Sequence, residues 1–290
     1  FFTACQTQNS EKNWIDQLMP TTTKNELIDP DGTTIKTRIK LPEGFERTDE
    51  KTGTFGYYLK NLPLKPDQTP VYLHNETLKK RQDVHAAIID ISIGKRNLQQ
   101  CADATMRLRA DYLYEQKKYD SIRFNFTNGF NAKYGKWRNG QRILVKGNKV
   151  SWYNGGTKSD SRSSFDKYLT MVFSYAGTLS LAKEMKKVAV KDMQIGDVFL
   201  QGGSPGHAVI VVDIAKNEKG SKMFLLAQSY MPAQEIHVLK NFKNVDSSPW
   251  YNTENLEQLL TPEWNFNKNN LGLTLKVGER WTPFYFGLSD

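Results

Sequence analysis

The feature that most constrains the fold is an apolar run that follows a glycine-rich turn. The turn is Gly202-Gly-Ser-Pro-Gly206, and His207 stands between it and the apolar run from Ala208 to Ile214. A short apolar run bounded by turn residues is typical of a strand that is buried on both faces. The rest of the chain must therefore supply layers that cover both sides of this strand.

Length and composition are sufficient for such a core. The chain has 290 residues, of which 38% are hydrophobic and 24% are charged, which is typical of a globular protein. Its net charge is +9, but the basic residues are scattered and form no long run or nucleic-acid motif. We therefore expect a lysine-rich solvated surface and no nucleic-acid partner, with attraction to anionic cell-wall polymer or lipid as the alternative.

The first residues predict export. Phe2-Thr3-Ala4-Cys5 resembles a bacterial lipobox, and Phe1-Phe2 resembles the end of an apolar signal segment. The resemblance implies a lipid on Cys5 and a membrane-anchored lipoprotein of the bacterial cell envelope, on its periplasmic or surface side. An ordinary thiol at Cys5 is the alternative. We assign residues 1–30 to a signal remnant, lipobox and tether, and residues 31–290 to a single domain.

Apolar periodicity predicts the main elements along the chain. Strands are expected over residues 34–41, 84–93, 208–214 and 223–230, with a hairpin over residues 143–153 that turns at Gly147-Asn148. Helices are expected over residues 97–116, with Asn97 as the N-cap, and over residues 163–187. Residues 121–140 are predicted to be an irregular loop.

Cys101 lies in the first turns of the predicted helix over residues 97–116. The helix dipole favours a thiolate at this end, so we expect a lowered pKa and a nucleophilic sulfur. The alternative is a small core residue, because Cys101 also shares an apolar stripe with Leu98, Leu108 and Tyr112.

A cysteine nucleophile requires a base and a group that orients the base. His207 is the first candidate base, since it opens the buried strand directly after the flexible turn, and His85 is the second. If the following strand pairs with this one around a turn near Glu218-Lys219, Val209 lies opposite Gln228. The side chain of Gln228 then lies on the same face of the sheet as that of His207. Gln228 is therefore the expected orienting group, although a slip of one residue would substitute Ser229.

These motifs resemble the papain-like superfamily, and most closely the NlpC-type cell-wall peptidases. The resemblance rests on a helix-borne cysteine, on Gly206-His-Ala-Val-Ile-Val-Val-Asp213 and on a polar residue in the following strand. It implies an α+β fold with an antiparallel sheet packed on the Cys-bearing helix. It also implies a catalytic role for Cys101, His207 and Gln228.

Three further segments resemble an envelope lipoprotein family of Bacteroidetes described only as a domain of unknown function. They are Leu98-Gln-Gln-Cys-Ala-Asp-Ala, Pro205-Gly-His-Ala and Ala227-Gln-Ser-Tyr-Met-Pro-Ala-Gln.

The expected function is a thiol hydrolase, a peptidase or amidase that acts on an amide bond, by analogy in cell-wall peptide. Cys101 would attack the carbonyl carbon, and His207 would take and return the proton. We expect no cofactor and no metal, since the sequence has no His-x-x-x-His or Cys-x-x-Cys spacing. The alternatives are a lipoprotein binding module with a degenerate papain-like cleft and a structural envelope protein.

Overall fold

A computed structural model of the chain describes residues 27–254, 256–267 and 279–280. Cys5 and nearly all of the expected tether lie outside the described residues. Leu27 to Pro30, which we assigned to the tether, are part of the folded body, because Ile28 pairs with Ile39 and the N–H of Lys40 donates to the carbonyl of Leu27 at 2.7 Å. The folded part therefore begins a few residues earlier than the sequence suggested.

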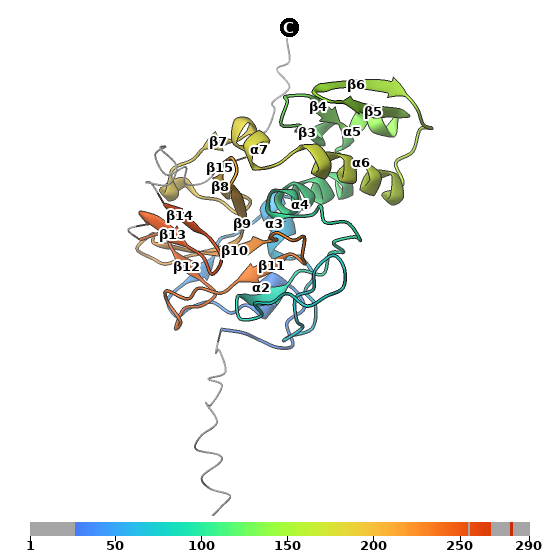
Figure 1. The fold of residues 1–290 in the computed structure, drawn as a ribbon. Coiled ribbons are helices and arrows are strands. Elements are labelled where there is room, and N and C mark those ends of the chain that lie inside the picture. Colours follow the sequence, from blue (N-terminus) through green and yellow to red (C-terminus); the bar gives the residue numbers. More distant parts are fainter. Residues whose placement is uncertain (1–26, 255, 268–278, 281–290) are drawn as a thin grey trace, which may run out of the picture.

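The fold is mixed α/β and is built around a curled antiparallel sheet that forms a half-barrel (Figure 1). Within the described residues nine strands join this sheet. Their spatial order is β2 (His85–Ile88), β11 (His237–Leu239), β10 (Lys222–Gln228), β9 (His207–Lys216), β8 (Val198–Gln201), β15 (Glu279–Arg280) and β7 (Lys186–Lys187). Two short strands pair outside this path, β1 (Glu46–Arg47) with β9 and β12 (Tyr251–Asn252) with β10.

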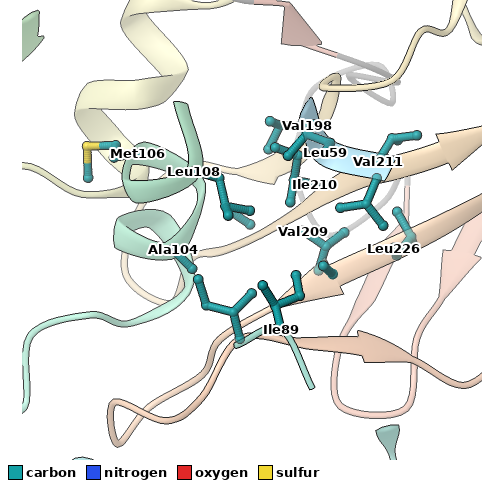
Figure 2. Packing of buried hydrophobic residues seen from close by; sticks show 14 of the residues in the cluster. Leu59, Ile89, Ala104, Met106, Leu108, Val198, Val209, Ile210, Val211 and Leu226 are labelled. Carbon is teal, nitrogen blue, oxygen red and sulfur yellow. The ribbon is translucent and has the colours of Figure 1, made fainter. Parts of the chain in front are cut away.

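Strand β9 is the centre of the core. All its residues from His207 to Ala215 are buried, as the apolar run predicts. Helices α4 (Cys101–Glu115) and α3 (Phe55–Lys60) pack against it. Figure 2 shows Ala104 and Leu108 on the side of α4 that faces this strand, whereas Met106 points to the opposite side. The expected layer of helix on antiparallel sheet is therefore present.

A second group of elements lies at one end of the molecule, beyond α4 (Figure 1). It contains η1 (Tyr119–Ser121), β3 (Arg123–Asn125), β4 (Asn131–Lys133), α5 (Tyr134–Arg138), β5 (Gln141–Lys146), β6 (Lys149–Asn154) and α6 (Arg162–Tyr175). The rings of Tyr134, Phe165 and Tyr168 pack together in its interior. The other elements are α2 (Ile35–Arg38), α7 (Thr178–Glu184), η2 (Val190–Asp192), β13 (Gln258–Leu260) and β14 (Asn265–Asn267).

The predicted strand over residues 34–41 is wrong, since the structure has the helix α2 there. Ile35 and Ile39 are both fully buried, and their spacing of four residues places them on one face of a helical turn. The hydroxyl of Thr34 accepts a hydrogen bond from the N–H of Thr37, which starts the turn. Tertiary burial of the two isoleucines therefore overrides the alternating pattern.

Two other predictions need correction, and one is confirmed. The helix over residues 163–187 is two helices, α6 and α7, separated at Ala176-Gly177, because Ser180 accepts a hydrogen bond from the N–H of Gly177 and starts a new helix. The loop over residues 121–140 contains β3, β4 and α5. The hairpin around Gly147 is confirmed, since β5 pairs with β6 up to Lys146 and Lys149.

No helix in the described ranges is long and apolar enough to cross a membrane.

A buried ion pair ties β1 to the centre of the sheet. Asp213 is fully buried in β9, and its carboxylate accepts a hydrogen bond from Nε of Arg47 at 2.7 Å. A second guanidinium nitrogen of Arg47 donates to the carbonyl of Ile39, after α2. Removal of one member of such a pair leaves the other as an uncompensated charge in the interior.

We therefore expect Asp213→Ala to lower the free energy of unfolding by about 3 kcal/mol, because it leaves Arg47 without its carboxylate. The matched control is Asp166→Ala, which removes a carboxylate from an exposed i,i+4 pair with Arg162 and should change stability by less than about 0.5 kcal/mol. Urea denaturation of both variants measures the difference. Equal losses would show that the Arg47–Asp213 pair does not stabilise the sheet.

Candidate functional site

Cys101 is the first residue of α4, which begins four residues later than predicted. The expected N-cap, Asn97, instead accepts a hydrogen bond from the N–H of Ala233 at 2.7 Å. The N–H of Gln100 donates to the carboxylate of Asp103 at 3.0 Å, which closes the first turn. Cys101 therefore stands at the helix terminus itself and is partly exposed as a residue.

The segment before Cys101 is held against the chain that follows β10. The hydroxyl of Ser229, which is fully buried, lies 2.8 Å from the carbonyl oxygens of Gln99 and Gln234. Ser229 was the alternative neighbour of His207 under a shifted register. In the structure Ser229 instead holds the segment that leads into Cys101, through its two hydrogen-bond contacts.

His207 is the first residue of β9 and is 1% exposed. Its ring stacks on the indole of Trp264, with 5.0 Å between the ring centroids, and packs against the ring of Tyr230 at 5.0 Å. Trp264 belongs to the loop between β13 and β14. No sequence pattern connects this part of the chain with the site, because a contact between residues that are far apart in the chain has no local signature.

Gln228 orients His207. Nε2 of His207 and Oε1 of Gln228 are 2.8 Å apart. The sheet register explains this contact, since Ala227 pairs with Ile210 at this end of β9 and Gln228 therefore faces Val209, as predicted. A bulge between Leu225 and Leu226 shifts the remaining pairs by one residue.

Two charged residues that sequence analysis did not single out extend this contact. Nε2 of Gln228 donates to Oε2 of Glu263 at 2.7 Å, and Oε1 of Glu263 forms an ion pair with Nζ of Lys79. The side chains of Lys79 and Glu263 are only 8% and 9% exposed. Neither residue lies in a motif, so no sequence signal identifies them.

The sulfur of Cys101 lies beside β9. The backbone N–H groups of Ala208, the residue after His207, and of Ala102 lie close enough to the sulfur to lower the pKa of Cys101. Tyr230 connects the two candidate residues, since its ring contacts His207 and its hydroxyl lies within electrostatic range of Cys101. The structure therefore brings together the helix terminus with Cys101, the start of β9 with His207 and the end of β10 with Gln228.

Burial shifts the pKa values of both Cys101 and His207. Loss of solvent raises the pKa of the Cys101 thiol to about 11, although the N–H groups of Ala208 and Ala102 oppose the change. The expected lowering of this pKa is therefore wrong, because desolvation exceeds the stabilisation that the helix terminus provides. Burial also lowers the pKa of His207 to about 4, although the hydrogen bond that its Nε2 makes with Oε1 of Gln228 opposes the change. At pH 7 the two side chains are a thiol and a neutral imidazole.

The second candidate base, His85, has different partners. Its Nε2 lies 3.1 Å from the carbonyl oxygen of Thr69, and its ring packs edge-on against His237, with centroids 6.1 Å apart. Burial lowers the pKa of His85 as well. The sulfur contact to Ala208 therefore favours His207 as the partner of Cys101.

A cavity of about 450 Å³ adjoins the residues that support His207. It is lined by Gln201, Pro205 and the loop from Thr261 to Asn265. Gln201 pairs with His207 across β8 and β9, and its Oε1 accepts a hydrogen bond from the indole of Trp264 at 3.2 Å. A ligand in this cavity would contact the same loop that covers His207.

In the part of the chain that the structure describes, no group of three or more His, Cys, Asp or Glu side chains is arranged to hold a metal ion.

Comparison with known proteins gives one match. The family described as "Domain of unknown function (4846)" matches residues 35–272, which include Cys101, His207, Gln228 and Glu263. No curated protein and no solved structure matches the chain.

The buried histidines predict a loss of stability in acid. Burial lowers the pKa of His207 to about 4 and that of His237 to about 3, so both stay neutral in the folded chain while the unfolded chain binds protons near pH 6.5. Their stabilising contribution is therefore complete above about pH 6.5 and decreases as the pH falls towards 4.

We expect each of these histidines to reduce the free energy of unfolding by about 2 kcal/mol between pH 7 and pH 5. Urea denaturation at both pH values measures the change, and His207→Gln should remove about half of it. A stability that does not change between these pH values would contradict the lowered pKa values.

Proposed function

The chain belongs to the family described as "Domain of unknown function (4846)", and we propose that it is a thiol hydrolase that cleaves amide bonds with Cys101, His207 and Gln228. The observation that carries the proposal is the 2.8 Å contact between Nε2 of His207 and Oε1 of Gln228, formed next to the residue whose N–H contacts the Cys101 sulfur. A nucleophile, a base and a group that orients the base are the three parts that thiol acyl transfer requires.

The proposed reaction has two steps. In the first, Sγ of Cys101 attacks the carbonyl carbon of the amide while its proton passes to Nδ1 of His207. The tetrahedral oxyanion lies near the N–H of Cys101 at the helix terminus. The C–N bond then breaks, and His207 returns the proton to the leaving amine. In the second step, water attacks the thioester with His207 as the base, which releases the carboxylic acid and restores the thiol.

The protonation states define the starting point of this reaction. Because the pKa of His207 is lowered, its imidazole is neutral at pH 7 and has one unprotonated ring nitrogen, but the same shift makes it a weaker base than a free imidazole. The pKa of Cys101 is raised, so the thiol does not ionise by itself at this pH. Proton transfer to His207 must therefore accompany the attack, and the reaction depends on the orientation of the imidazole.

The arrangement also supports the likeness to the papain-like superfamily as part of this proposal. A cysteine at the terminus of α4, a histidine at the start of β9 and an amide on β10 occur in the order that the resemblance implies. The helix packs on an antiparallel sheet. The NlpC-type resemblance gives cell-wall peptide as the substrate class, and the cavity beside Trp264 is large enough to receive part of a peptide.

A non-catalytic binding module is the second candidate, and a specific observation favours it. With a thiol whose pKa is raised to about 11, the group at Cys101 is a weak nucleophile until a base removes its proton. If the geometry with His207 does not allow that transfer, the same cavity would hold a peptide without cleaving it.

We expect the protein to cleave peptidoglycan stem peptides, detected as new carboxyl and amino termini by mass spectrometry. Cys101→Ala and His207→Ala should each reduce kcat/KM by at least about 1000-fold, because they remove the nucleophile and the base. Gln228→Ala should reduce it by up to about 100-fold, because it only disturbs the orientation of the imidazole.

Asp166→Ala, on the exposed face of α6, is the control and should retain wild-type activity. Cleavage that persists in Cys101→Ala would contradict the hydrolase proposal. Stem peptide that binds at equilibrium but remains intact would support the binding module instead.

We further propose that the protein is anchored in the bacterial envelope through a lipid on Cys5. The support is the sequence Phe2-Thr3-Ala4-Cys5, which resembles a lipobox, and the polar segment after it, which would act as a tether. Several acyl chains on one cysteine would give a stable anchor, whereas a single chain binds a membrane only weakly.

We expect Cys5→Ala, expressed from the complete gene, to move the protein from the membrane fraction to the soluble envelope fraction. Cys101→Ala is the matched control, since it also removes a thiol and should leave the membrane association unchanged. Immunoblots of the two fractions measure the distribution. A Cys5→Ala protein that still sediments with membranes would refute the lipid anchor.

A further inference from the structure

We infer that Glu263 is a positioning residue that acts through Gln228 to hold the ring proton of His207 on Nε2 and to leave Nδ1 free as the base. The inference deepens the proposed function and rests on it, because it gives a reason why Nδ1 of the imidazole is unprotonated and able to act as the base. Glu263 comes from the loop between β13 and β14, far in sequence from Cys101, His207 and Gln228.

The contacts form a continuous chain through the interior. Nε2 of His207 meets Oε1 of Gln228 at 2.8 Å, and Nε2 of Gln228 donates to Oε2 of Glu263 at 2.7 Å. His207 and Gln228 are each 1% exposed. Buried polar groups of this kind must satisfy one another, because water does not reach them.

The carboxylate decides which way the amide of Gln228 points. An ionised carboxylate only accepts hydrogen bonds, so it requires the NH2 group of Gln228 on its side. The reverse orientation would place Oε1 of Gln228 against Oε2 of Glu263, where two acceptors repel each other. Glu263 therefore directs the carbonyl oxygen of Gln228 towards His207.

The orientation of the amide in turn decides the tautomer of the imidazole. Because Oε1 of Gln228 only accepts, Nε2 of His207 must carry a proton to form the 2.8 Å contact. A neutral imidazole has one ring proton, so Nδ1 has a free lone pair. Nδ1 is the nitrogen that would receive the proton of Cys101.

Lys79 contacts the second oxygen of the Glu263 carboxylate. Its ammonium forms an ion pair with this oxygen, and both side chains are more than nine-tenths buried. A carboxylate with a cation at one oxygen and an N–H donor at the other accepts in both contacts. Lys79 also lies over the ring of Tyr230, 5.8 Å from its centroid.

The loop that carries Glu263 is held by hydrogen bonds and acts on His207 through two of its residues. The hydroxyl of Thr261 donates to the carbonyl of Trp264 at 2.7 Å, and the guanidinium of Arg81 donates to the carbonyl of Pro262 at 2.8 Å. Trp264, next to Glu263, stacks on the His207 ring. One loop therefore places both the indole that covers the imidazole and the carboxylate that sets its tautomer.

The test is the ¹⁵N NMR spectrum of the histidine rings at pH 7, with His207 assigned by means of a His207→Ala variant. In the wild-type protein we expect Nε2 to resonate as an N–H nitrogen and Nδ1 as a nitrogen with a free lone pair. Of the titratable groups near the ring, Tyr230 packs against it and His237 interacts with it electrostatically.

In Glu263→Gln the new amide is able to accept from Gln228 or to donate to it, so both orientations of Gln228 become allowed. We expect the Nε2–H tautomer of His207 to fall from nearly all to about half of the population, with both ring resonances at intermediate positions. The rate of stem-peptide cleavage should fall by about twofold or more, in proportion to that population.

Asp83→Asn is the matched control. It makes the same change of carboxylate to amide in the nearby pair with Arg81, which does not contact Gln228, and it should leave the His207 spectrum unchanged. If Glu263→Gln does not fold because Lys79 loses its partner, the double variant Lys79→Met with Glu263→Gln removes the unpaired charge and should show the same mixture of tautomers.

A wild-type His207 with its proton on Nδ1 would overturn the inference, and so would a folded Glu263→Gln variant that keeps a pure Nε2–H tautomer. Both readouts are independent of catalysis. Absence of cleavage with the expected spectra would therefore reject the hydrolase and leave the role of Glu263 intact.

Discussion

The packing of α4 on β9 is the contact on which the rest of the site depends. It buries the central strand of the sheet, and it brings the first residue of the helix next to the first residues of the strand. Leu108 and Ala104 make the apolar side of this contact (Figure 2). Cys101 thus lies near Ala208, the residue after His207, because two core elements begin at the same end of their interface, although these residues are far apart in the chain.

Burial has opposite effects on structure and on reactivity at this interface. It stabilises the fold by removing apolar surface from water, but it also removes solvent from the thiol and the imidazole. The result is a neutral pair at pH 7, with the pKa of Cys101 raised and that of His207 lowered. The N–H of Ala208, near the thiol, and the hydrogen bond of His207 Nε2 to Oε1 of Gln228 offset part of this cost. The hydrolase that we propose would therefore depend on accurate proton transfer rather than on a thiolate that is already present.

Polar groups in the interior are arranged in pairs and chains for the same reason. Arg47 with Asp213 connects β1 to the sheet, and Lys79 with Glu263 ends the chain that starts at His207. In both pairs each buried charge has a partner of opposite sign, which limits the penalty of desolvation. The second pair differs from the first because it also controls the orientation of an amide, and through it the proton of an imidazole.

Sequence alone determined the features that depend on local pattern. The apolar run after Gly206 predicted the buried strand, and the register near Glu218 predicted that Gln228 faces Val209. Cys101 was predicted near a helix terminus because apolar periodicity begins there. Only the tertiary structure decided how burial changes the conformation and the pKa values of these residues, and which other residues contact them. The helix at residues 35–38 replaced a predicted strand, because Ile35 and Ile39 share one buried face. The pKa of Cys101 is raised where the sequence predicted a lowered value, because desolvation has no signature in neighbouring residues. Glu263 and Trp264 belong to the site through contacts between distant segments, which have no such signature either.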